Sequence, residues 1–124
     1  MNTDNGLVVS IPEVGYEAEK TASGLRIRPV NWRTLRAPTE IEIEIAGSAP
    51  AGDSLQRRRL GERDATYRID SAPGGSGGTE RTLHAYIATP MGIIHLQQTV
   101  QSEAPADSDF NLGWEILGSA RIVK

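Results

Sequence analysis

The chain has 124 residues, enough for one domain over residues 1–124, and a formal net charge of −3 from 13 basic and 16 acidic residues. This acidic balance argues against a nucleic-acid binder whose affinity comes from neutralising phosphates. The lack of cysteine excludes disulfides and thiolate chemistry, and no apolar run is as long as a membrane-spanning helix.

The first part of the sequence predicts three strands. Residues 6–12 form a short apolar run that ends at a proline, and residues 24–30 alternate apolar side chains with Arg26 and Arg28. Residues 40–45 alternate Ile and Glu, so their glutamates share one face, which we expect to be solvated and paired with the two arginines. Trp32 is expected to cover an edge of the core.

The middle of the chain is more polar. Residues 46–63 are predicted to form a long loop with one helical turn near residues 55–60 and three solvated arginines, Arg57, Arg58 and Arg59. Residues 65–71 predict another strand, with alternate residues inward. Residues 71–79 are rich in glycine but lack the Lys-Ser/Thr of a phosphate-binding loop. They are interpreted either as a mobile hairpin tip or as a loop that becomes ordered on a partner.

Residues 80–102 predict a long antiparallel hairpin with a turn at residues 89–92. In this register Tyr86 lies opposite His95, and His84 opposite Gln97, on one face. The other face points to the core and carries Leu83, Ala85, Ile87, Ile94 and Leu96. Because the strands are antiparallel, the glycine-rich loop 71–79 and the acidic loop 101–109 meet at one end of the sheet.

A closing helix is predicted after the acidic loop. Ser108 is the expected N-cap, with Asp109 near the positive end of the helix dipole. Phe110, Trp114 and Leu117 are spaced as the apolar stripe that packs on the hairpin. The mostly antiparallel strands and this helix predict the α+β class.

Catalytic interpretations are weak. Two histidines without a third ligand make a poor metal site, and no serine stands in a nucleophile elbow. Glu103, Asp107 and Asp109 could form a carboxylate pair or a calcium site, but they lack the spacing of an EF-hand. A simpler interpretation of these acidic residues is a projecting loop that inserts into another protein's groove. An enzyme using His84, His95 and this loop stays as an alternative.

Short segments along the chain resemble the Mog1/PsbP-like α/β/α sandwich, in which helices cover an antiparallel β-sheet. They are Val8-Val9-Ser10-Ile11-Pro12 with Gly15-Tyr16, Gly92-Ile93-Ile94-His95-Leu96, and Phe110 with Trp114-Glu115-Ile116-Leu117-Gly118-Ser119. More closely, the sequence resembles periplasmic immunity proteins that neutralise a type VI secreted muramidase effector. The alternative within this fold is a regulatory module that binds a different protein partner.

The resemblance implies a non-enzymatic inhibitor without a cofactor of its own. It implies a lipoprotein precursor, with the lipidated cysteine in a removed leader, and a periplasmic protein that blocks the effector's substrate groove near bound calcium. Carried onto this chain, the resemblance implies that Glu103 would contact the effector's catalytic centre. Supporting contacts are expected from the hydroxyl of Ser102 and the carboxylates of Asp107 and Asp109. Further contacts are expected from the backbone of Gly74, Gly75, Ser76 and Gly77.

Overall fold

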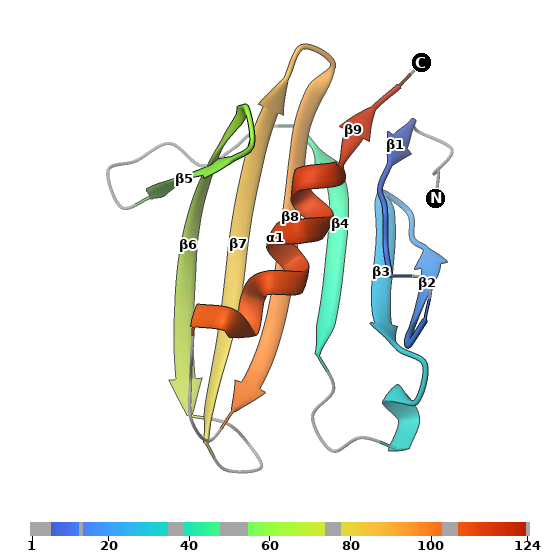
Figure 1. The fold of residues 1–124 in the computed structure, drawn as a ribbon, viewed down its shortest axis with the longest axis vertical. Coiled ribbons are helices and arrows are strands. Elements are labelled where there is room, and N and C mark those ends of the chain that lie inside the picture. Colours follow the sequence, from blue (N-terminus) through green and yellow to red (C-terminus); the bar gives the residue numbers. More distant parts are fainter. Residues whose placement is uncertain are drawn as a thin grey trace.

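The computed structural model describes residues 6–12, 14–34, 39–47, 55–73, 78–102 and 107–123. Its main feature is a seven-stranded antiparallel sheet with the order β2-β3-β4-β8-β7-β6-β5 (Figure 1). The strands are β2 (Tyr16–Lys20), β3 (Gly24–Pro29), β4 (Glu40–Ala46), β5 (Gln56–Leu60), β6 (Arg63–Pro73), β7 (Thr79–Thr89) and β8 (Gly92–Ser102).

A second, two-stranded sheet joins the beginning and end of the described chain. It pairs β1 (Leu7–Val8) with β9 (Arg121–Ile122). The remaining elements are the 3₁₀ turns η1 (Trp32–Thr34) and η2 (Asp107–Phe110) and the helix α1 (Asn111–Ser119). The strand predicted over residues 6–12 is therefore confirmed only at its first residues, and it lies outside the main sheet.

The core lies between α1 and one face of the main sheet. The predicted alternation places Leu25 and Ile27 of β3 and Ile41 and Ile43 of β4 in this layer, each 1% exposed. The predicted stripe consists of Phe110 at the end of η2 with Trp114 and Leu117 of α1, and it is buried in the same cluster. Since a shift of one residue would turn each isoleucine toward solvent, this burial selects the strand register.

The predicted register of the long hairpin is confirmed. Tyr86 pairs with His95, His84 pairs with Gln97, and the turn closes at Thr89 and Gly92. The predicted inward residues of this hairpin are at most 2% exposed: Leu83, Ala85, Ile87, Ile94 and Leu96.

Two strands were not predicted. Residues 56–60 form β5 and not a helical turn, because Gly61 takes a positive φ of 65° and lets the chain turn back into a ladder with β6. Residues 16–20 form β2, whose alternation is too short to recognise, because its apolar side consists of Tyr16 and Ala18 alone and then reaches Lys20. Both strands are at the edges of the sheet, where apolar alternation is weakest.

The predicted position of Trp32 is also wrong. Its ring lies against the guanidinium groups of Arg28 and Arg33, at 4.0 and 4.6 Å from the ring centroid, and its indole N–H donates to Glu17 at 2.7 Å. This indole packs on charged side chains and is not part of the buried cluster.

The helix begins differently from the prediction. Ser108 lies within η2, and the N-cap residue is Phe110, which makes no side-chain capping bond. Instead, the Gln98 side chain of β8 accepts a hydrogen bond from the Gly113 N–H at 3.1 Å. Because the first N–H groups of a helix lack partners inside it, Gln98 acts as a cap supplied by the sheet.

The α+β class is confirmed as a mostly antiparallel sheet with a short helix. Among the described residues α1 is the single α-helix, and it covers one face of the sheet (Figure 1). Helices on both faces, as in the α/β/α sandwich, therefore stay a prediction. No helix in the described ranges is long and apolar enough to span a bilayer.

Candidate functional site

The predicted partner-binding end is the end of the sheet where β6 stops, β7 starts and β8 stops. Pro73 pairs with Thr79, and Thr79 pairs with Ser102. The attachment points of the glycine-rich loop and of the acidic loop therefore lie on three adjacent strands, as predicted from the hairpin register. We call this region the loop end.

Most of the predicted contact residues fall outside what the structure describes. These are Gly74, Gly75, Ser76, Gly77 and Glu103. Ser102 ends β8 and Asp107 begins η2, but the structure describes only their backbone. The structure thus places the flanks of both loops, and the contacts assigned to these residues stay predictions.

Asp109 is the predicted contact residue whose side chain is described. Its carboxylate forms an ion pair with Arg81 of β7 at 2.5 Å, and the two side chains are 22% and 13% exposed. The Arg81 guanidinium also lies 5.0 Å from the centroid of the Phe110 ring. Asp109 is therefore held inside this chain on the helix side of the sheet, where it ties η2 to β7.

Gln98 completes this attachment. Its side chain is 1% exposed, and its Nε2 donates to the Asp109 carbonyl at 3.2 Å while its Oε1 caps α1. We name Arg81, Gln98, Asp109 and Phe110 the anchor cluster. It fixes the chain immediately after the acidic loop to two central strands. Arg81 and Gln98 could have been recognised in the sequence as polar residues at inward positions of apolar strands.

The opposite side of the sheet, which we call the open face, is highly charged near β3 and β4. Arg26 lies 3.0 Å from Glu19, 3.1 Å from Glu40 and 3.2 Å from Glu42, and Arg28 lies 2.8 Å from Glu19. Hydrogen bonds to Glu42 and Glu19 raise the pKa of Arg26 above its usual value. The predicted pairing between the glutamate and arginine faces is confirmed.

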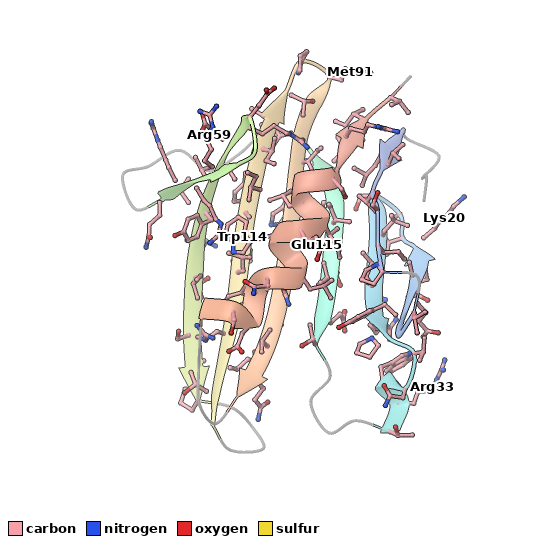
Figure 2. The ribbon with its side chains drawn as sticks, viewed as in Figure 1. Lys20, Arg33, Arg59, Met91, Trp114 and Glu115 are labelled. Carbon is pink, nitrogen blue, oxygen red and sulfur yellow. The ribbon has the colours of Figure 1, made fainter. Side chains whose placement is uncertain are left out.

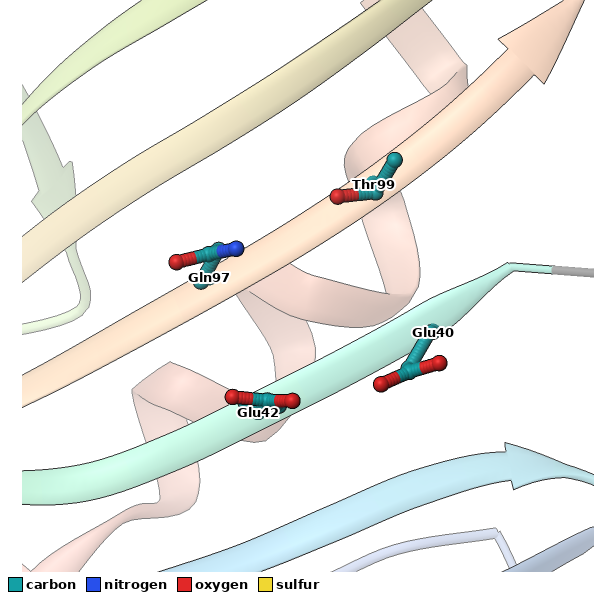
Figure 3. A pocket seen from close by; sticks show the side chains of 4 residues that line it. All are labelled: Glu40, Glu42, Gln97 and Thr99. Carbon is teal, nitrogen blue, oxygen red and sulfur yellow. The ribbon is translucent and has the colours of Figure 1, made fainter. Parts of the chain in front are cut away.

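A shallow pocket of about 220 Å³ opens on this face between β4 and β8. Glu40, Glu42, Gln97 and Thr99 line it (Figure 3). Both carboxylates contact Arg26, which also pairs with Glu19, so this one guanidinium offsets only part of their negative charge. Within the described ranges, no three His, Cys, Asp or Glu side chains are grouped so that they could hold a metal ion.

The two histidines lie in a stack on the open face. The Tyr86 ring lies 4.6 Å from His95, and His95 lies 5.8 Å from His84, all nearly parallel. His95 Nδ1 lies 3.2 Å from Glu44. A hydrogen bond from the Ser23 hydroxyl, followed by the hydrogen bond and charge of His95, lowers the pKa of Glu44. The three stacked rings therefore pack against one another on the open face.

The surroundings of His84 disfavour its protonated form. Burial first, and then the charges of Arg68 and His95, lower the pKa of this imidazole, although Asp70 at 3.6 Å acts in the other direction. The histidines lie on the open face, whereas Asp109 lies on the helix side. The described carboxylate of the acidic loop and the two imidazoles therefore do not share a site, which disfavours the enzymatic alternative.

Comparisons with known proteins agree with the resemblance. The model of the type six secretion immunity 3 domain matches residues 8–121. The immune protein Tsi3 of Pseudomonas aeruginosa is 38% identical over 120 residues, which cover 95% of this chain and 78% of that protein. A crystal structure from Bacteroides thetaiotaomicron is similar with a TM-score of 0.65 and 11% identity, over 96% of this chain and 46% of that one. The last similarity concerns the fold alone.

Proposed function

Since this chain belongs to the type six secretion immunity 3 family, we propose that it binds a cognate type VI effector and blocks its activity, which protects the producing cell. We propose further that the effector is a muramidase that cleaves peptidoglycan, and that inhibition is non-enzymatic. The observation that supports this mode is the meeting of three strand ends at the loop end. Two loops attached to one rigid edge can enter a groove together.

In this proposal the acidic loop does most of the blocking. Glu103 approaches the catalytic centre of the effector, either by a hydrogen bond to a catalytic acid or beside a bound calcium ion. Ser102 and Asp107 flank it, and residues 74–77 offer backbone groups to the walls of the groove. The anchor cluster supports this role, because an ion pair and a buried amide hold the chain just after the loop. A loop fixed at its ends loses less entropy when it binds.

For Asp109 we propose a role that differs from the direct contact implied by the resemblance. Its carboxylate is paired with Arg81 at 2.5 Å, so we propose that it positions the loop and does not itself contact the effector. The protein needs no cofactor in this scheme, and any calcium belongs to the effector. We propose a periplasmic location and a lipoprotein precursor, consistent with an effector that acts on peptidoglycan, and we retain the Mog1/PsbP-like fold as part of the proposal.

Calorimetry with the purified effector tests the proposal. Glu103→Arg should weaken binding by more than about 2 kcal/mol, the size expected for a central contact. Glu115→Arg on the exposed side of α1 is the matched control and should bind as the wild type does (Figure 2). Equal affinities for the two variants would contradict the role of Glu103. No binding by folded wild-type protein would contradict the proposed partner and favour the regulatory module.

A further inference from the structure

Among the strands that the structure describes, β5 is one edge of the main sheet. It pairs with β6 and with no other strand of the described chain. Its first four residues, from Gln56 to Arg59, are exposed. An edge strand of this kind presents unpaired backbone N–H and C=O groups that can receive another strand.

The arginines of this edge are partly ordered by the rest of the protein. Arg58 points to the helix side, where its guanidinium lies 4.6 Å from the centroid of the Trp114 ring. Arg59 lies 3.5 Å from Asp64 and donates to the Gly61 carbonyl at 3.1 Å. Arg57 has no ion pair with the described part of the chain. Arg58 and Arg59 are thus held by contacts within the chain, whereas the charge of Arg57 is available to a partner.

Charge is distributed unevenly between this hairpin and the remainder of the chain. Residues 55–70 contain five arginines against three acidic residues, whereas the rest contains eight basic against thirteen acidic residues. Lys20 and the acidic residues of β2 lie at the opposite edge of the sheet from Arg59 (Figure 2). The β5 hairpin is therefore a basic region on an acidic protein.

This charge decides which strand the edge can accept. Antiparallel pairing of β5 with β5 of a second copy, centred on Arg58, would place arginines opposite arginines, which is unfavourable. A strand that carries carboxylates at alternate positions would instead face Arg57 and Arg59 on one side of the sheet. Charged edges protect sheets from self-association, and the same charge selects an acidic partner.

We propose that β5 is a second binding surface, which receives an extended acidic segment of the effector as an added strand. The inference rests on the proposed function for the identity of this partner. β5 pairs with residues 63–67 of β6, at the opposite end of that strand from Pro73 and the loop end. The effector would then hold the immunity protein at two separate regions, and the second would add mainly to the rate of association.

A synthetic peptide tests the edge without the effector. The probe is an acetylated, amidated peptide of alternating Glu and Val, and its control replaces Glu with Gln. Hydrogen exchange followed by NMR should show slower exchange in residues 56–60 with the acidic peptide only. Arg57→Glu should remove this protection. Arg121→Glu makes the same charge change at an exposed residue of β9 and should keep it. Protection at another strand, or none, would overturn the inference.

Calorimetry with the effector completes the test. Arg57→Glu should weaken binding about three- to tenfold, with a larger effect at low salt, and Arg121→Glu should leave binding unchanged. Equal binding by these two variants would overturn the inference and leave the proposed function intact. No binding by the wild type would contradict the proposed function, and the peptide experiment would still decide the edge. The inference would also be overturned if the wild type self-associated and Arg57→Glu abolished that self-association.

Discussion

Replacing Gln98 with leucine is expected to destabilise the protein by about 2–3 kcal/mol. The side chain is 1% exposed and makes two hydrogen bonds, one to the Asp109 carbonyl and one from the Gly113 N–H. Leucine keeps the volume but removes both of these hydrogen bonds. Loss of a helix cap costs about 1 kcal/mol, and a buried unpaired amide costs roughly 1–3 kcal/mol. For a chain of this size, the melting temperature should fall by roughly 10 °C.

Urea unfolding and calorimetry measure this effect, and the neighbouring residue supplies the control. Gln97 lies on the open face and makes no hydrogen bond to the described chain, so Gln97→Leu should change stability by less than about 0.5 kcal/mol. A Gln98→Leu protein as stable as the Gln97→Leu protein would refute the capping argument.

The same contact predicts an unusual result at Gly113. An added Cβ would lie 2.2 Å from Gln98 Oε1, so Gly113→Ala should destabilise the protein although alanine favours helices by about 1 kcal/mol. In a Gln98→Ala background the penalty should shrink. Independent, additive effects in this double-mutant cycle would contradict the contact.

Three further changes test other parts of the structure. Arg81→Met removes the ion pair with the Asp109 carboxylate, which is 22% exposed, and should cost roughly 2 kcal/mol in urea unfolding; a neutral result would contradict the anchor cluster. Burial lowers the pKa of His84 in the folded protein. As the pH falls below the ordinary value of 6.5, the unfolded state therefore binds more protons than the folded state, and the free energy of unfolding should decrease. His84→Gln should flatten that decline between about pH 7 and 5, and an unchanged pH profile would refute this. Gly24→Ala would place a Cβ 1.9 Å from the Ile43 carbonyl oxygen and should cost about 3 kcal/mol; wild-type stability would show that β3 and β4 are spaced differently.

The sequence predicted those strands whose two faces differ in polarity. Residues 40–45 alternate Ile and Glu, and the central hairpin also alternates apolar and polar side chains, so burial of one face selects the register. The edge strand β5 was missed because its residues are largely polar on both faces, and β2 was missed because only Tyr16 and Ala18 form its apolar side. Their pairing depends on a neighbouring strand and not on a pattern of their own.

The helix start and part of the candidate site could not be predicted, because they depend on contacts between residues that are distant in the sequence. Ser108 is a good local N-cap residue, but the bond is made by Gln98, which precedes Gly113 by 15 residues and reaches it from the sheet. Likewise, the hairpin register placed both loops at one end, whereas the pairing of Asp109 with Arg81 was not predicted. The contacts of Glu103 rest on the family resemblance, since they depend on the surface of another protein.

A peptidoglycan turbidity assay tests the central claim most directly. The muramidase effector, with calcium present, would be titrated with the wild-type protein, with Glu103→Arg and with Glu115→Arg. The proposal predicts that one equivalent of wild type or Glu115→Arg stops hydrolysis, and that Glu103→Arg requires at least tenfold more. Unimpeded hydrolysis in the presence of excess folded wild-type protein would contradict the immunity mechanism proposed for this chain.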